Sequence, residues 1–358
     1  SICENGGSGL KVCCPQIKTS TNSPIIKPTI SPPTSRRTPL PRSCGVNARN
    51  DRITGGEDAG LGSHPWNVIF RGRERIDGGG SCIDSNPSCR AWADIGECRK
   101  NPDFMKENCK KSCNNCPSGS TGVTTWFCGG VLITEQHVLT AAHCFPNSIE
   151  IEFVRIGEYD LSKEIDTEET LTAPKTQDIK VARIIKHEKW DYDCRRCNDI
   201  AIAKLEHPAR FHQFYVQPIC LPTEPLEESI GFSVAAYQNK HGIATGWGVT
   251  DPANIFQTTK GSDILQKVEL LINELNFCRQ RKEIFPDKNM ILCAGKGDGK
   301  DTCRGDSGGP LMLTDKFGQI WYVVGIASFG DTVCGSKNGQ SIFTNVHHYI
   351  DWIKSNLV

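Results

Sequence analysis

The sequence has no net charge and no long hydrophobic run. Its 358 residues contain 41 Lys plus Arg and 41 Asp plus Glu, so composition supplies no field that would attract nucleic acid or an anionic membrane. No stretch approaches the roughly 18 consecutive apolar residues that a membrane span needs. We therefore expect a soluble protein with neither nucleic acid nor membrane as a partner. The chain starts at Ser1 rather than Met, which indicates a processed or truncated chain.

Cysteine, in contrast, is abundant. Nineteen cysteines would be a hazard in a reducing cytosol but form a covalent framework in an oxidising compartment, which predicts a secreted, extracellular protein. The odd number leaves at least one cysteine without an internal partner. Zinc binding is the alternative for the closely spaced pairs Cys113/Cys116 and Cys194/Cys197, but no second suitably spaced pair accompanies either, so disulfides are favoured.

The composition divides the chain into parts. Residues 15–43 contain seven prolines and five basic residues but no acid, which predicts a linker that cannot bury a core. We assign residues 15–52 to a Pro-rich linker and activation segment. Residues 1–14, with Cys3, Cys13 and Cys14, are too few to form a core of their own.

Short alternating apolar runs punctuated by glycine follow from Asp51 onward and predict an all-β domain. Apolar residues at three- and four-residue spacing between Val346 and Leu357 predict one closing amphipathic helix. The strand pattern breaks between Phe70 and Trp126, where six cysteines fall within residues 82–116. This segment is predicted to be an inserted disulfide-rich mini-domain.

Three segments each carry one member of a nucleophile, base and orienter set. They are centred on His143 in Ala-Ala-His-Cys, on Asp199 in Asn-Asp-Ile-Ala and on Ser307 in Gly-Asp-Ser-Gly-Gly-Pro. A serine hydroxyl needs a base to accept its proton, and the base needs a group that holds one tautomer. Each segment alone is weak evidence, because a lone His or Asp is more often structural.

In this order and sequence context, the set closely resembles the chymotrypsin and trypsin family. The resemblance assigns residues 53–358 to a protease domain and implies two antiparallel six-stranded barrels with a C-terminal helix. It implies that Ser307 attacks the substrate, that His143 transfers the proton and that Asp199 orients His143. The backbone N–H groups of Gly305 and Ser307 would form the oxyanion hole. No cofactor is required for this chemistry.

The resemblance also implies a preference for basic residues. Asp301 stands six residues before Ser307, where trypsin-like members place the acid that binds Arg or Lys. Thr302 and the segment Ser328-Phe329-Gly330 would line the pocket, and this segment would pair with the substrate backbone. Ser341 stands where a glycine is usual, and its hydroxyl would narrow the pocket and change the balance of Arg against Lys.

An activation site is implied by Arg52-Ile53-Thr54-Gly55-Gly56. Cleavage after Arg52 would free the amine of Ile53, which in the family pairs with the aspartate before the nucleophile, here Asp306. Since a buried carboxylate without a cation is costly, the cut would be coupled to formation of the pocket.

The resemblance assigns most cysteines to disulfides. For the protease domain it implies Cys44–Cys220, Cys128–Cys144, Cys278–Cys293 and Cys303–Cys334. Cys194 and Cys197 stay open: they form a short local loop, are free or pair elsewhere.

Cys13-Cys14-Pro15, the long linker and the Cys44 tether resemble the clip-domain proteases of arthropod clotting and melanisation cascades. Residues 1–14 would then be the C-terminal remnant of a clip-like domain. The implied partners are a protein substrate that is itself a zymogen, an upstream activating protease and protein inhibitors. Glu158 and Glu168 match carboxylates of the trypsin calcium loop, and a solvated acidic loop is the alternative reading.

The insertion resembles the sea-anemone potassium-channel toxin (ShKT) domain, which implies the pairs Cys82–Cys116, Cys89–Cys109 and Cys98–Cys113. Asp103 and Phe104 stand where the toxin has its channel-plugging Lys and Tyr, so we expect a binding or scaffold role rather than channel block. Two rival functions are a catalytically weak protease homologue acting as a binding cofactor, and a protease that merely carries the toxin-like module. The intact catalytic set argues against the first, and Asp103 weakens the second.

Overall fold

The fold is described from a computed structural model. It describes residues 38–47, 57–74, 84–86, 89–94, 96–110, 112–113, 124–192, 194, 196–223, 237–250, 261–278, 287–295, 301–330, 334 and 339–358. The predicted activation residues Arg52 and Ile53, the cysteines of residues 1–14 and the predicted Cys82–Cys116 pair lie outside these ranges. No helix within the described ranges is long and apolar enough to cross a membrane.

The first sheet is antiparallel and has the order β8-β5-β2-β3-β4-β10-β9. Its strands are β2 (Asn67–Glu74), β3 (Thr124–Thr134), β4 (His137–Thr140), β5 (Ile149–Ile156), β8 (Gln177–Ile179), β9 (Val181–Lys186) and β10 (Ala201–Leu205). The edge strands β8 and β9 are separated in sequence by Lys180 alone. One nearly continuous stretch of chain therefore pairs with β5 at one edge and with β10 at the other.

The second sheet has the order β1-β12-β11-β14-β15-β16-β13, and β12 also pairs with β13. Its strands are β1 (Glu57–Asp58), β11 (His241–Gly246), β12 (Gln266–Asn273), β13 (Ile291–Ala294), β14 (Pro310–Thr314), β15 (Trp321–Phe329) and β16 (Ser341–Asn345). The β12–β13 pairing closes six of these strands into a barrel. The predicted all-β fold is confirmed: strand pairing closes the second barrel, whereas the continuity of β8 with β9 joins the edges of the first.

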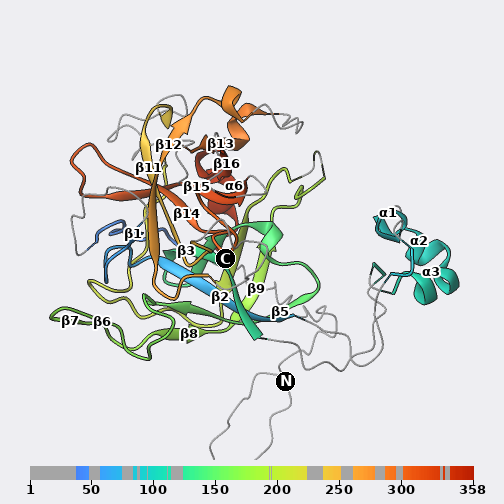
Figure 1. The fold of residues 1–358 in the computed structure, drawn as a ribbon, viewed down its shortest axis with the longest axis horizontal. Coiled ribbons are helices and arrows are strands. Elements are labelled where there is room, and N and C mark those ends of the chain that lie inside the picture. The colour runs from blue at the N-terminus through green and yellow to red at the C-terminus, as the bar shows by residue number, and fades with distance from the viewer. Residues whose placement is uncertain are drawn as a thin grey trace, which may run out of the picture. The chain divides into compact units, whose positions relative to one another are not determined.

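Short elements complete the protease domain (Figure 1). They are a small hairpin of β6 (Thr167–Glu168) and β7 (Leu171–Thr172), the 3-10 turns η1 (Ala142–Cys144), η3 (Leu275–Phe277), η4 (Lys288–Met290) and η5 (Val346–Tyr349), and the helix α6 (Ile350–Ser355). The predicted C-terminal helix is confirmed as η5 followed by α6. Its apolar residues Val346, Tyr349, Ile350, Ile353 and Leu357 are all buried.

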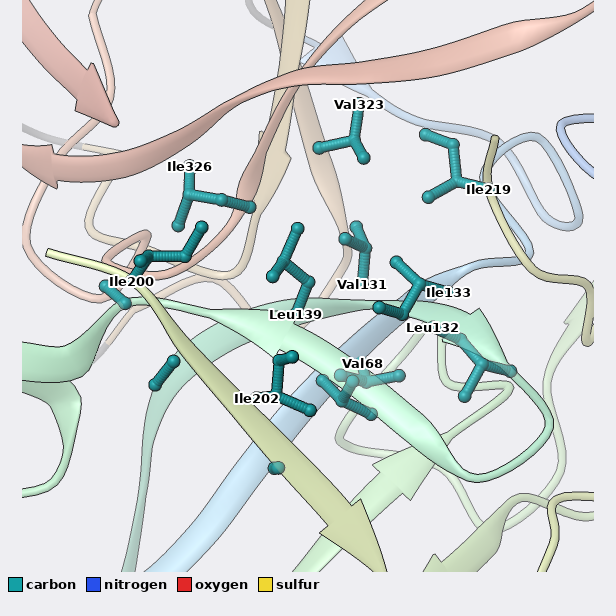
Figure 2. Packing of buried hydrophobic residues seen from close by; sticks show 14 of the residues in the cluster. Val68, Val131, Leu132, Ile133, Leu139, Ile200, Ile202, Ile219, Val323 and Ile326 are labelled. Carbon is teal, nitrogen blue, oxygen red and sulfur yellow. The ribbon is translucent and has the colours of Figure 1, made fainter. Parts of the chain in front are cut away.

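One apolar core contacts both barrels. Val131, Leu139 and Ile202 come from the first barrel and pack in one cluster with Val323 and Ile326 of the second (Figure 2). These side chains are fully buried. Because burial of apolar surface is the main favourable term in folding, this shared core fixes the two barrels against each other.

The insertion contains three short helices, α1 (Cys89–Asp94), α2 (Glu97–Lys100) and α3 (Pro102–Asn108). Its core is small: Cys89, Met105 and Cys109 are buried, and Cys98 packs against them. The disulfides Cys89–Cys109 and Cys98–Cys113 cross this core. A unit with so little apolar area depends on such covalent links for stability.

Outside the insertion, five disulfides join described cysteines. They are Cys44–Cys220, Cys128–Cys144, Cys194–Cys197, Cys278–Cys293 and Cys303–Cys334. Of the alternatives left open for Cys194 and Cys197, the structure contains the short local loop. The longest-range disulfide ties Cys44, in the segment before β1, to Cys220, which packs with buried residues of the second barrel such as Leu270 and Val324.

Candidate active site

His143 and Asp199 lie in contact at the junction of the barrels. His143 belongs to η1, just after β4, and Asp199 precedes β10. The Nδ1 atom of His143 lies 2.7 Å from Oδ2 of Asp199, and the backbone N–H of His143 donates to Oδ1 at 2.9 Å. The carboxylate therefore holds both the ring and the backbone of the histidine, which fixes the imidazole orientation that a base needs.

Asp199 is 1% exposed, and the second barrel supplies further contacts to it. The hydroxyl of Ser328, in β15, donates to Oδ2 of Asp199. The hydroxyl of Thr344, in β16, donates to the backbone carbonyl of Asp199 at 2.7 Å. A buried carboxylate is stable only when its oxygens are hydrogen-bonded, so these contacts hold Asp199 in one position.

Ser307 occupies a tight turn immediately before β14. Its carbonyl accepts a hydrogen bond from the backbone N–H of Gly129 at 2.8 Å. The turn begins at Gly305, whose φ of +107° disfavours any residue with a side chain, and whose missing Cβ would lie 2.9 Å from Cα of Gly248. Only glycine allows this approach of the two loops.

A cavity of about 530 Å³ opens beside these residues. It is lined by His143 and Ser307 together with the predicted pocket residues Thr302, Ser328, Gly330 and Ser341. Sequence elements far apart in the chain thus meet at one concave site with a hydroxyl and an imidazole at its wall. This is the arrangement expected of a nucleophile and base facing a bound substrate.

Asp301 connects to the cavity wall through Ser341. The hydroxyl of Ser341 donates to Oδ1 of Asp301 at 2.5 Å, and Thr302 donates its hydroxyl to Ser341 at 3.0 Å and its backbone N–H to Asp301 at 2.8 Å. Ser341 is 2% exposed. A Cβ at Gly330 would lie only 2.8 Å from the Ser341 hydroxyl. Ser341 therefore occupies the space that a side chain at position 330 would need. Three predicted pocket residues, Asp301, Thr302 and Ser341, are therefore joined by hydrogen bonds.

Asp306, the residue directly before Ser307, is a second enclosed acid near the cavity. Its carboxylate accepts backbone N–H groups from Gly248 and Cys303, each at 2.8 Å. A Cβ at Gly246 would lie only 2.2 Å from Oδ1 of Asp306. Burial raises the pKa of Asp306 to about 6, and the charge of Asp301 acts in the same direction. The carboxylate is thus enclosed where a cation would stabilise its charged form.

The acidic loop after β5 does not fit a calcium ion. The Oε1 atom of Glu158 accepts the N–H of Tyr159 at 2.8 Å, and Oε2 lies 3.3 Å from the guanidinium of Arg155. Both oxygens of Glu168 also have protein donors, the backbone N–H of Leu61 at 3.1 Å and the Tyr159 hydroxyl at 3.0 Å. Calcium needs six to eight oxygen ligands. Here a protein cation and N–H and O–H donors occupy the two carboxylates that resemblance suggested as ligands.

A metal at the candidate active site is also unsupported. Within the described part of the chain, the group of potential ligands that lies close enough together is Cys128, His143 and Cys144. The two cysteines form a disulfide with each other, so they offer no thiolate.

Sequence reasoning missed several residues of the cavity. Ser328 was placed in the pocket wall, but its hydroxyl also binds Asp199, 129 positions away. Trp190, Arg196 and Arg304 line the cavity as well. The position of Arg304, between Cys303 and Gly305, the residue predicted to belong to the oxyanion hole, was a usable signal. No local pattern identified Arg196, because its place depends on how the preceding loop folds.

Family models match two parts of this chain, and several known proteases are similar to most of it. The family model for Trypsin matches residues 113–353, and a model described as ShK domain-like matches residues 81–116. A CLIP domain-containing serine protease of Bombyx mori is 32% identical over 97% of this chain and 80% of the relative. Phenoloxidase-activating enzyme 1 of Spodoptera litura is 30% identical over 100% and 83%.

Two further matches agree with these. The proclotting enzyme of Tachypleus tridentatus is 30% identical over 100% of this chain and 81% of the relative. The crystal structure of the Drosophila Grass clip serine protease of the Toll pathway aligns with a TM-score of 0.62 and 26% identity, covering 87% of this chain and 73% of that one.

The acidic loop generates a prediction about pH. Burial, followed by the charge of Asp166, raises the pKa of Glu158 from 4.5 to about 7. The folded state then retains a proton that the unfolded state has lost, so stability falls as pH rises from about 4.5 to 7. We expect Glu158→Gln to reduce this loss by on the order of 2 kcal/mol. Urea unfolding at pH 5 and pH 7.5 measures it.

The matched control is Glu164→Gln, since Glu164 belongs to the same loop but its side chain is 77% exposed. It should keep the wild-type pH dependence. Millimolar calcium should leave the wild-type unfolding midpoint unchanged. A clear calcium-dependent rise in stability, or equal pH dependence in Glu158→Gln and wild type, would contradict this account of the loop.

Proposed function

This chain belongs to the trypsin family of serine proteases, and we propose that it is a zymogen whose active form cleaves protein substrates after arginine or lysine. The observation that carries the proposal is the contact of His143 with the buried Asp199 at a cavity that Ser307 also lines. Catalysis by such a set needs a base that is oriented by an acid and faces the nucleophile.

In the proposed mechanism, Ser307 attacks the carbonyl carbon of the scissile peptide bond. His143 accepts the hydroxyl proton through Nε2, because Nδ1 faces Asp199, and later donates it to the leaving amine. Asp199 stabilises the imidazolium, and Ser328 helps to position Asp199 through its hydrogen bond. The backbone N–H groups of Gly305 and Ser307 stabilise the oxyanion, and each such donor accounts for roughly a hundred- to thousandfold in rate.

Specificity is proposed to come from Asp301 and Ser341. A carboxylate next to the pocket, joined to its wall through Ser341, favours a cationic side chain, and an apolar side chain would leave it without a countercharge. The Ser341 hydroxyl already donates to Asp301. A lysine ammonium, which is compact, fits beside this hydroxyl better than a planar guanidinium that needs both carboxylate oxygens. Ser341 would thus shift the balance from Arg toward Lys.

Activation is proposed to follow cleavage after Arg52. The raised pKa of Asp306 indicates a carboxylate whose charged form lacks sufficient stabilisation from its surroundings. The ammonium of Ile53 would supply the missing positive charge, and the resulting ion pair would stabilise the adjacent Gly305–Ser307 turn. Arg52 and Ile53 lie outside the described residues, so the support for this step is the resemblance to the family.

The proposed setting is an extracellular proteolytic cascade. The printed names of the relatives include a proclotting enzyme and a phenoloxidase-activating enzyme, and the many disulfides suit an oxidising compartment. The partners of the enzyme would be an upstream activating protease, a downstream zymogen as substrate and protein inhibitors. We assign residues 1–14 to a clip-like remnant and 15–52 to the linker and activation segment, ahead of the protease domain at 53–358.

The inserted ShK-like module, residues 82–116, is proposed to bind protein partners of the enzyme. Phe104 is 42% exposed, and its ring contacts that of Trp92 edge-on at 5.9 Å. Trp92 is itself partly buried against the core of the insertion, so the exposed ring of Phe104 has a fixed support, and exposed aromatic side chains are enriched at protein contact surfaces. Asp103 at the position of the toxin's plugging lysine argues against channel block.

The first test concerns activation. The intact chain should hydrolyse an arginyl or lysyl peptide substrate at a small fraction of the rate of the chain cut after Arg52, and Arg52→Gln should abolish this gain. Ser307→Ala in the cut chain should lower kcat by a factor on the order of a million. Initial rates before and after cleavage measure both effects, and equal rates would refute the zymogen proposal.

The second test concerns the pocket. Asp301→Ser should remove the preference for basic side chains, since the pocket then lacks its negative charge. Ser341→Gly should raise the Arg-to-Lys ratio of kcat/KM by several-fold, because Asp301 would regain an oxygen for bidentate pairing. A wild-type enzyme that cleaves best after Phe or Leu would show that the pocket assignment is wrong.

The third test concerns the insertion. Arg73 of β2 pairs with Thr124 of β3, so a short turn can replace residues 75–123 without moving either strand. Hydrolysis of a small peptide should then stay within about twofold of wild type, while activity on a protein substrate or inhibition by a protein inhibitor should change. Loss of small-peptide hydrolysis would identify the module as structural, and no change in any assay would refute a binding role.

A further inference from the structure

A loop next to the candidate active site presents Arg196 at the rim of the cavity. The disulfide Cys194–Cys197 closes this loop, and Arg196 lies inside it with φ of 65°. The backbone N–H of Arg196 donates to Oδ1 of Asp191 at 2.7 Å, and the N–H of Asp191 donates to the Cys197 carbonyl at 3.1 Å. The loop is therefore held by covalent and hydrogen bonds immediately before Asp199.

The side chain of Arg196 has a defined position. Its guanidinium carbon lies 4.9 Å from the centroid of the Phe329 ring, a distance typical of a cation–π contact. Phe329 is the last residue of β15 and stands between the pocket residues Ser328 and Gly330. Arg196 thus links the loop of the first barrel to the wall of the pocket, although the residue itself is exposed.

Two arginines lie at this rim, and the cavity lining also includes two acids, Asp191 and Asp306. Arg196 and the exposed Arg304 line the same cavity as His143 and Ser307. Within the described part of the chain, neither arginine forms an ion pair with a carboxylate. The adjacent acid, Asp191, directs its carboxylate to the backbone of Arg196. A negative group that enters from solvent would therefore find a guanidinium with free N–H donors.

The direction of the substrate follows from the pocket. The pocket receives the side chain just before the scissile bond, so the wall segment at residues 328–330 lies beside the substrate residues that precede that bond. Arg196 packs on this segment through Phe329. We propose that Arg196 makes the enzyme favour protein substrates that carry Asp or Glu shortly before the cleaved basic residue, an inference that rests on the proposed protease function.

The test uses peptides that end in a basic residue and a reporter group, with Asp, Ala or Lys placed in turn at each preceding position. For the activated wild-type chain, kcat/KM should favour Asp over Lys by about two- to tenfold at one or more positions, and the ratio should fall as salt is added. Arg196→Gln should bring the ratio close to one, Arg196→Glu should invert it, and Arg196→Lys should keep part of it.

Arg183→Glu is the matched control, because Arg183 lies on β9 and does not line the cavity but changes the net charge equally. It should keep the wild-type ratio. A wild-type ratio of one or below at every position, or a ratio that Arg196 variants leave unchanged, overturns the proposal. Inversion by Arg304→Glu alone would also overturn it, since the selecting charge would then be Arg304.

The Ala-containing peptide separates the two levels of the argument. If the activated wild type does not hydrolyse it, the proposed protease function fails, and this inference fails with it. If the Ala peptide is hydrolysed but the Asp-to-Lys ratio is flat, the protease function stands and only the role of Arg196 is refuted. Hydrolysis of the Ala peptide by each variant also reports that the variant is folded.

Discussion

The buried carboxylate of Asp199 is the constraint on which the site depends. A charge this far from water must be compensated by hydrogen bonds, and the donors to the carboxylate come from both barrels: His143 from the first and Ser328 from the second. Thr344 of the second barrel adds a hydrogen bond to the backbone carbonyl of Asp199. The two barrels can satisfy Asp199 only in one relative position, the position in which the shared core around Leu139 and Ile326 is also closed. Packing and electrostatics therefore select the same arrangement, and that arrangement brings His143 and Ser307 to one cavity.

Asp306 is the counterpart of Asp199. It too is enclosed, but its donors are two backbone N–H groups, and burial raises its pKa to about 6. One carboxylate thus accepts hydrogen bonds from side chains of both barrels, while the other, next to Ser307, accepts hydrogen bonds from backbone N–H groups. Under the proposed activation, cleavage after Arg52 supplies the cation that Asp306 lacks, and the new ion pair stabilises the turn that carries Ser307.

Much of this could be predicted from the sequence, because the informative patterns are local. Gly-Asp-Ser-Gly-Gly-Pro and Ala-Ala-His-Cys identify the candidate set within a few residues each, and the spacing from Val346 to Leu357 predicted the final helix. The side-chain contacts around the pocket could not be predicted, because they join distant positions. Ser341 donates to Asp301 across 40 residues. Arg196 packs on Phe329 from a loop closed by Cys194–Cys197, a pair that the sequence did not decide. The acidic loop is a different case: Arg155 stands only three residues before Glu158, but no sequence pattern indicated that both oxygens of Glu158 have protein donors.

The central claim is that Ser307 becomes a reactive nucleophile only when the chain is cut after Arg52. A fluorophosphonate probe, which reacts covalently with activated serines, tests it directly on the full chain, with the labelled residue identified by peptide mass spectrometry. The account predicts rapid labelling of Ser307 in the cut chain, and little labelling in the intact chain or in cut Asp199→Asn. Equal labelling of the intact and cut chains, or labelling of a serine other than Ser307, would contradict it.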